Sequence, residues 1–276
     1  MNSSGSNLGA SDVGCVLTFQ VATPAGIVLQ VAAARSPGTA LNERLEIINN
    51  TVPLPAEELA GAAGGRQHLV RAQPGTLSVT YQARVTPGVV TAEPVTAGER
   101  VSALRPSRYC PSDRFVGFAQ RHCGDSPATL ERVRAICAYV WQHVEYVSGA
   151  SGPSTDAVDT LLRGQGVCRD VAHLVTALCR AVNIPARIAA VYAPGLSPMD
   201  LHAVVETEIE GVWQVWDATR LAPRCTLVRI ATGRDAADTA FATVISGQAE
   251  LQNLEITAVA GDDLPFDDHE SLVALG

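Results

Sequence analysis

Cys168 occupies a position in the sequence that suits a nucleophile. It stands where a glycine-rich turn, Gly164 to Val167, gives way to a segment with apolar residues at helical spacing, so we expect it in the first turn of a helix. Unpaired backbone N–H groups and the positive end of the helix dipole favour a thiolate over a thiol at such a position. The glycines also leave room for a substrate carbonyl beside the Cys168 N–H. The pattern therefore predicts a cysteine nucleophile.

A candidate base and a candidate carboxylate follow in the next part of the chain. His202 opens one β-rich run and Asp217 closes a second, and Glu210-Gly211 between them is typical of a hairpin turn. A two-residue turn places Val204 opposite Asp217, so that His202 and Asp217 become diagonal neighbours on one side of the hairpin, about 7–8 Å apart at Cα. An odd loop or a bulge would separate them. The spacing predicts a base oriented by a carboxylate, as nucleophilic catalysis by cysteine requires.

Three stretches of the chain resemble the bacterial transglutaminase-like proteins, a branch of the papain-like cysteine enzymes. Within residues 104–246 they read LRPSRYCPSDRF, GVCRDVAHLVTALCRAVNIPARIAAVY and LHAVVETEIEGVWQVWDAT. The resemblance implies that Cys168 is the nucleophile, His202 the general base and acid, and Asp217 the residue that orients His202. It also implies that residues 232–247 belong to the later strands of the catalytic core.

The chain departs from the usual pattern of that family at several positions. Arg169, Asp170 and Val171 follow the nucleophile, where the family usually has Gln, Asp and an aromatic residue. Val204 replaces the usual Trp two positions after the histidine, and Ala218 replaces the usual Pro after the aspartate. These departures concern the substrate groove, while all three catalytic residue types are present.

The expected reaction begins with attack of the Cys168 thiolate on a carboxamide carbonyl. His202 protonates the departing ammonia or amine, and a thioester forms. Water as the second nucleophile gives a peptidase or amidase acting on a peptide or a small amide, which we favour. An amine gives a transglutaminase, and a non-catalytic interaction module of the same fold is a further alternative. The Cys168 N–H is the expected oxyanion donor, with Gln142 and Tyr146 as candidates for a second one.

Other cysteines and histidines have simpler interpretations. Cys137 and Cys179 lie on apolar helical stripes and are expected in the core. His173 is expected to be a hydrogen-bonded core or surface histidine rather than a group behind the nucleophile. His122 and Cys123 have no second cluster at ligand spacing, so no metal is expected. The sequence contains no phosphate-binding motif that would imply an organic cofactor.

Composition favours a cytoplasmic enzyme. The seven cysteines of this 276-residue chain are irregularly spaced and do not form a disulfide framework. Residues 1–10 lack a basic region followed by an apolar run, so no signal peptide is expected, and the apolar stretch 27–34 is too short to span a membrane. All 20 basic residues are arginines, and the net charge of −8 argues against nucleic acid as a partner. A homo-oligomer remains open.

The order of elements predicts an α+β protein with a division near residue 105. Residues 1–104 hold short β runs between Pro and Gly turns, which predicts an N-terminal antiparallel β-sandwich. Residues 105–260 hold helices and then an antiparallel sheet, as expected for a papain-like, transglutaminase-like core. The acidic tail, residues 261–276, is expected to be a solvated end.

One long helix is expected in the second half of the chain. Ser126 can cap it and Pro127 suits its first turn. Its buried stripe is expected to contain Leu130, Val133, Cys137, Val140, Trp141 and Val144.

Overall fold

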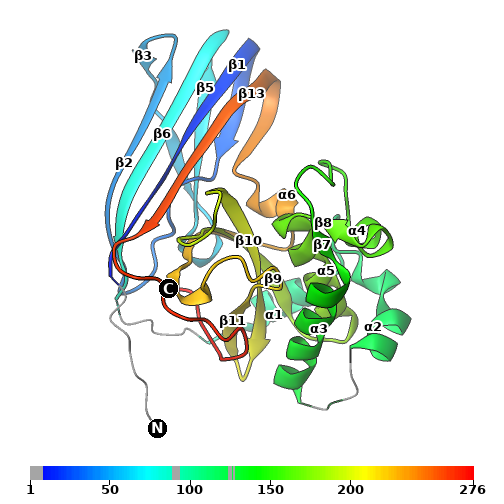
Figure 1. Ribbon diagram of the computed structural model, residues 1–276. Helices are drawn as coiled ribbons and strands as arrows, with labels where there is room; N and C mark the ends of the chain where they lie inside the picture. Colours follow the sequence, from blue (N-terminus) through cyan, green and yellow to red (C-terminus); the bar gives the residue numbers. More distant parts are fainter. Residues whose placement is uncertain (1–8, 89–93, 124–125, 127) are drawn as a thin grey trace.

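The computed structural model describes residues 9–88, 94–123, 126 and 128–276. A large sheet, a small sheet and a group of helices lie side by side in that order (Figure 1). One hydrophobic core joins the helices to the small sheet, and a second lies on the large sheet and includes residues of the small one. The predicted α+β class is confirmed.

The predicted N-terminal sandwich is not confirmed. Within the described residues, the strands form one antiparallel seven-stranded sheet, because long strand β1 pairs with β6 along its first part, with β5 along its second part and with β13 along its whole length. Register shifts between β1 and β13 let the pair bend. The strands are β1 (Ser11–Leu29), β2 (Ala40–Asn49), β3 (Val52–Pro53), β4 (Glu57–Ala60), β5 (Arg66–Ala72), β6 (Gly75–Thr86) and β13 (Ala242–Ala260).

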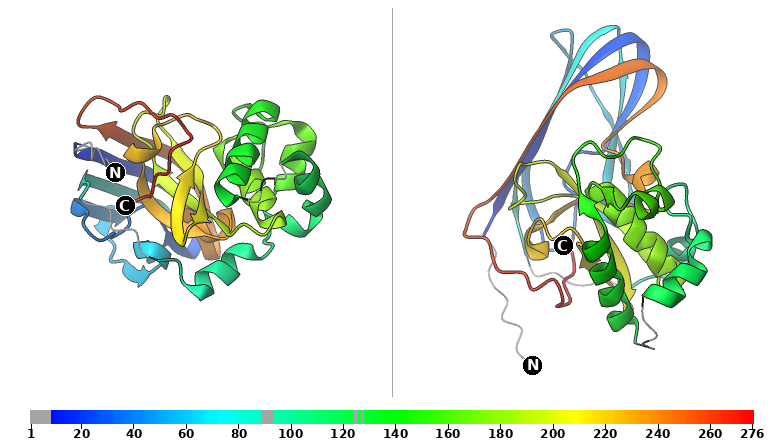
Figure 2. Two further views of the ribbon diagram at one scale, coloured as in Figure 1. Left: turned by 90° about the horizontal axis from the view of Figure 1, so that it is seen from below. Right: turned by 45° about the vertical axis from the view of Figure 1, so that its right-hand side comes forward.

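Strand β13 corrects the expected placement of residues 232–247. Thr232 and Gly233 lie in the small sheet as expected, but residues from Ala242 onward pair with β1 in the large sheet. Alternate residues of β13 pack against the core of the large sheet. This burial stabilises β13 in that sheet. The chain thus returns to its first sheet after the helical half, while the division at residue 104 stays a prediction. Figure 2 shows β13, in orange, running along the large sheet in a second view.

The small sheet has the strand order β11-β10-β9-β12, and all its pairs are antiparallel. Its strands are β9 (Ala186–Tyr192), β10 (Leu201–Ile209), β11 (Val212–Trp216) and β12 (Val228–Gly233). Two short strands, β7 (Glu145–Tyr146) and β8 (Gln165–Gly166), form a separate parallel pair. The helices are α1 (Ala97–Leu104), α2 (Val116–His122), α3 (Thr129–His143), α4 (Ala157–Arg163), α5 (Cys168–Ala181) and α6 (Ala236–Thr239).

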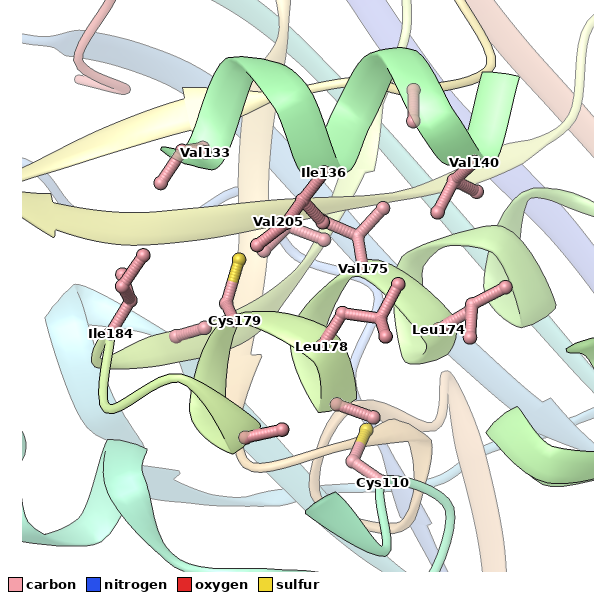
Figure 3. Close-up of a cluster of buried hydrophobic side chains, with 14 of the residues drawn as sticks. Cys110, Val133, Ile136, Val140, Leu174, Val175, Leu178, Cys179, Ile184 and Val205 are labelled. Carbon is pink, nitrogen blue, oxygen red and sulfur yellow. The ribbon is translucent and has the colours of Figure 1, made fainter. Parts of the chain in front are cut away.

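Helix α5 lies at the centre of the helical core. Every residue from Asp170 to Ala181 is buried, because α5 packs on the small sheet and on α3. Figure 3 shows the Cys179 side chain close to those of Ile136 and Val205, which come from α3 and β10. Cys179 is fully buried and Cys137 packs against the same core, so both are confirmed as core cysteines.

Helix α3 differs from its prediction at both ends. It begins at Thr129, later than expected, with Ala128 as N-cap. The Ser126 hydroxyl accepts a hydrogen bond from the Ala128 N–H at 3.2 Å, so this serine caps the preceding turn instead, and Pro127 lies outside the described residues. Near the other end, the Trp141 side chain is 49% exposed rather than buried.

The acidic tail is docked rather than solvated. The guanidinium of Arg224 is fully buried and forms an ion pair with Asp267 at 2.7 Å. The Val273 carbonyl accepts a hydrogen bond from the Val215 N–H of β11 at 2.7 Å. Leu275 is buried in a third apolar cluster against the small sheet. An ion pair, a backbone hydrogen bond and a buried leucine thus hold the tail in place.

Glu206 on β10 stabilises the small sheet through two arginines. Its buried carboxylate accepts hydrogen bonds from Arg187 at 2.7 Å and from Arg229 at 2.8 Å. Burial alone raises the pKa of Glu206, but the charges and hydrogen bonds of Arg229 and Arg187 lower it to about 2. The carboxylate therefore remains ionised in the folded protein.

We expect Glu206→Gln to lower the free energy of unfolding by about 3–5 kcal/mol at pH 7, because it leaves the buried Arg229 guanidinium without its counter-charge and removes one of the two carboxylates that pair with Arg187. Urea unfolding measures the change, and the exposed Glu250→Gln is the control, expected to lie within about 0.5 kcal/mol of wild type. Because the pKa of Glu206 is lower in the folded than in the unfolded protein, its carboxylate stabilises the fold at pH values above the unfolded pKa. The difference in free energy of unfolding between wild type and Glu206→Gln should therefore shrink as the pH falls from about 4.5 toward 2. Equal stabilities at pH 7 would contradict the assigned role of Glu206.

Candidate active site

Cys168, His202 and Asp217 meet where α5 begins, beside the start of β10 and the end of β11. His202 Nε2 lies 2.8 Å from Asp217 Oδ2, and both side chains are buried. The Cys168 Sγ lies 3.9 Å from the carbonyl oxygen of Leu201, the residue before His202. The Cys168 thiol is also among the groups that raise the pKa of the His202 imidazole. Three residues that are far apart in the sequence thus lie close together.

The predicted hairpin register is confirmed. Ile209 pairs with Val212, and the same register continues along β10 and β11 to the pair of Val205 with Trp216. No bulge interrupts it. Glu210 and Gly211 both have positive φ values, 52° and 82°, as a two-residue hairpin turn with the right twist requires. Asp217 follows β11 directly, so the unbroken register carries it to His202.

At the start of α5, the backbone of Gly166 passes close to the side chain of Asp170. Cys168 is the first residue of the helix, and the carboxylate of Asp170 accepts a hydrogen bond from the Val167 N–H at 2.9 Å. A Cβ on Gly166 would lie 2.8 Å from the Asp170 Cβ, so this position requires glycine. Cys168 itself is partly exposed, unlike Cys179 on the same helix.

The His202–Asp217 pair is charged at neutral pH. Burial alone lowers the pKa of the His202 imidazole, but the charge and hydrogen bond of Asp217 and the contact with Cys168 raise it to about 10. Burial raises the pKa of Asp217, and His202 and Thr219 reverse this and lower it. Among the described residues, Nδ1 of His202 is buried without a partner that meets hydrogen-bond geometry, and Nε2 is taken by Asp217. Nδ1 is therefore the atom that can exchange a proton with Cys168.

Tyr146 is the candidate oxyanion donor that the fold brings to Cys168. The parallel pairing of β7 with β8 sets Tyr146 opposite Gly166, two residues before the nucleophile. Burial, followed by the charges of Cys168 and Asp200, raises the pKa of Tyr146. Its phenol is therefore neutral and keeps a proton to donate. Gln142, the other candidate, lies exposed in the last turn of α3.

His173 is a core histidine, as expected, but among the described residues only one of its two ring nitrogens has a hydrogen-bond partner. It is fully buried, its Nε2 accepts a hydrogen bond from the Ala236 N–H at 3.1 Å, and its ring stacks on Tyr109. Burial lowers its pKa to about 4, so it is neutral at pH 7. In the part of the chain that the structure describes, no three His, Cys, Asp or Glu side chains are grouped to hold a metal, and no helix is long and apolar enough to cross a membrane.

The sequence interpretation missed two features beside the site. Thr219 donates two hydrogen bonds to Asp217, and a threonine two residues after an aspartate is a recognisable turn pattern that could have indicated this. The guanidinium of Arg220 lies 4.1 Å from the ring centroid of Trp141, joining α3 to the segment after Asp217. That contact explains why Trp141 is held at the surface, and no local pattern indicates it.

Known proteins share the fold and part of the sequence. Residues 117–218 match the family model described as the transglutaminase-like superfamily. A crystal structure from Cytophaga hutchinsonii, described as a "Putative Cysteine Protease", is 36% identical, with a TM-score of 0.87 over 97% of this chain and 96% of that chain. The periplasmic domain of TgpA from Pseudomonas aeruginosa is 19% identical, with a TM-score of 0.43 over 78% of this chain and 88% of that chain.

A curated relative covers a smaller part of the molecule. The uncharacterized protein ML0607 of Mycobacterium leprae (strain TN) is 27% identical over 113 residues, which are 41% of this chain and 39% of that protein. The match thus spans well under half of either protein.

Proposed function

Because the chain belongs to the transglutaminase-like superfamily, we propose that it is a cysteine hydrolase that cleaves an amide bond in a peptide or a small amide. The observation that carries the proposal is the 2.8 Å contact of His202 with Asp217 beside the partly exposed Cys168. The Cytophaga protein, which matches almost the whole chain and is described as a "Putative Cysteine Protease", supports hydrolysis over amine transfer. A cytoplasmic location is part of the proposal, supported by seven free cysteines.

In the proposed mechanism, the Cys168 thiolate attacks the carbonyl carbon and the carbonyl oxygen becomes an oxyanion beside the Cys168 N–H. The proton on His202 Nδ1 passes to the leaving nitrogen, the C–N bond breaks and a thioester remains on Cys168. His202 then accepts a proton from water, whose oxygen attacks the thioester and releases the carboxylic acid. Asp217 holds Nε2 throughout, so Nδ1 stays directed to the reacting atoms.

Amine transfer is the second candidate, since the same thioester could react with an amine, and the superfamily match supports that chemistry as well. We expect a glutamine-containing peptide, incubated with and without a primary amine, to give mainly hydrolysis products by mass spectrometry in both cases. Amine incorporation far above hydrolysis would instead identify a transglutaminase. An interaction module predicts no turnover of any amide, and no difference between wild type and Cys168→Ala.

We further propose that Tyr146 donates the second hydrogen bond to the oxyanion. Tyr146→Phe should lower kcat roughly 100-fold with little change in KM, because the lost hydrogen bond forms only as charge develops on the carbonyl oxygen. Steady-state kinetics measures this, with Tyr139→Phe as the matched control because the Tyr139 ring packs on the rings of His143 and Phe118 rather than on the site. A wild-type kcat in Tyr146→Phe would exclude the phenol as the donor.

A further inference from the structure

The two carboxylate oxygens of Asp217 have different partners. Oδ2 contacts His202 Nε2 at 2.8 Å, whereas Oδ1 accepts hydrogen bonds from the Thr219 N–H at 2.9 Å and from the Thr219 hydroxyl at 2.6 Å. The Asp217 side chain is only 1% exposed, so water cannot replace these donors freely. Three donors thus fix one buried carboxylate.

We propose that Thr219 is a positioning residue, whose hydroxyl holds Asp217 in the one orientation that aligns His202 with Cys168. The inference rests on the proposed function. It adds a fourth residue to the Cys-His-Asp arrangement, one that orients the aspartate. A carboxylate can rotate about its Cβ–Cγ bond, because this torsion has broad preferences. Two donors on Oδ1 remove that freedom and turn the free lone pairs of Oδ2 toward Nε2.

The hydroxyl and the backbone N–H of Thr219 contribute separately. The N–H bond to Oδ1 closes a local turn that any residue at this position could form. The Thr219 hydroxyl donates its one hydrogen bond to Asp217. The O–O distance is short, as expected for a hydrogen bond to a charged acceptor. Only a serine could replace this second donor. Substitutions of Thr219 can therefore remove the hydrogen bond of the hydroxyl and keep that of the backbone N–H.

The position of Thr219 also bears on the charge of His202. Its two hydrogen bonds are among the causes that lower the pKa of Asp217, and the charge of Asp217 in turn raises the pKa of His202. Loss of the hydroxyl lets the carboxylate turn, which weakens its contact with Nε2. The pKa of His202 should then fall, so the imidazolium is lost at a lower pH than in wild type.

The test compares Thr219→Val, which keeps the shape and removes the hydroxyl, with Thr219→Ser, which keeps the hydroxyl. We expect Thr219→Val to lower kcat about tenfold at an unchanged KM and to move the alkaline limb of the pH–rate profile about one unit toward acid. Thr219→Ser should stay within about twofold of wild type. Titration of the ring signals of the six histidines by NMR, with His202→Gln for assignment, should show the same acid shift without any substrate.

Thr219→Ala is a second hydroxyl-free variant, and thermal unfolding shows which variants are folded. Wild-type kcat and His202 titration in a folded hydroxyl-free variant would overturn the proposal, as would an equal loss of kcat in Thr219→Ser. Failure of the proposed function is a different result, namely amide turnover that survives Cys168→Ala. The NMR titration still reports on Thr219 in that case.

Discussion

Replacement of Cys168 with alanine should reduce amide hydrolysis by at least about 10⁴-fold, because no other group in the proposed site can form the thioester. Cys168 is the partly exposed first residue of α5, so its removal creates little buried cavity, and thermal unfolding should be close to wild type. Steady-state rates on an amide substrate, measured beside the unfolding midpoint, separate the chemical effect from a folding effect.

The control is Cys225→Ala, which removes another partly exposed thiol and should keep full activity. Burial and the charge of Asp267 raise the pKa of Cys225, so this thiol is protonated at neutral pH. Iodoacetamide at pH 6, followed by mass spectrometry, should therefore label Cys168 faster than Cys225 or the buried Cys179. If Cys168 reacted no faster than Cys179, the thiolate argument would fail and the interaction module would become the better hypothesis.

Asp217→Asn should lower kcat about 10³- to 10⁴-fold while the fold persists. The two Thr219 donors should hold the amide oxygen, which turns the amide nitrogen toward His202 Nε2. Two donors then face each other unless Nε2 loses its proton. The remaining proton of a neutral imidazole sits on Nδ1, where it can no longer accept the proton of Cys168.

The alkaline limb of the pH–rate profile should also move toward acid in Asp217→Asn. Asp217 raises the pKa of His202, so removal of its charge lets the imidazolium dissociate at lower pH. The exposed Asp113→Asn is the matched control and should change neither kcat nor the pH profile. Wild-type turnover in Asp217→Asn would mean that another group orients His202.

Local rules were sufficient for the core of the candidate site. The glycine turn before Cys168 and the two-residue hairpin loop each depend on neighbours in sequence, so the helix start and the register could be read directly. Parity then brought His202 to Asp217 without knowledge of the rest of the fold. The catalytic roles themselves stay predictions until the variants are measured.

Long-range choices were not accessible in the same way. Alternation marks β13 as a strand, but nothing local says that its partner is β1 at the other end of the chain. The tail was assigned to solvent on its acidity, although Val273 and the buried pair of Arg224 with Asp267 attach it. Trp141 fits the helical period but lies at the surface, where Arg220 packs on its ring. Each error concerns a partner that is distant in sequence.

The pairing of Ser11 with Ala260 has a consequence for biosynthesis. During translation, β1 emerges long before β13, the strand that completes its edge, so the nascent chain carries an unpaired β edge until Ala260 has left the ribosome. Contacts of such high sequence separation slow folding, because a long loop must close before they form. The large sheet can therefore be completed only after both ends of this long loop have been synthesised and brought together.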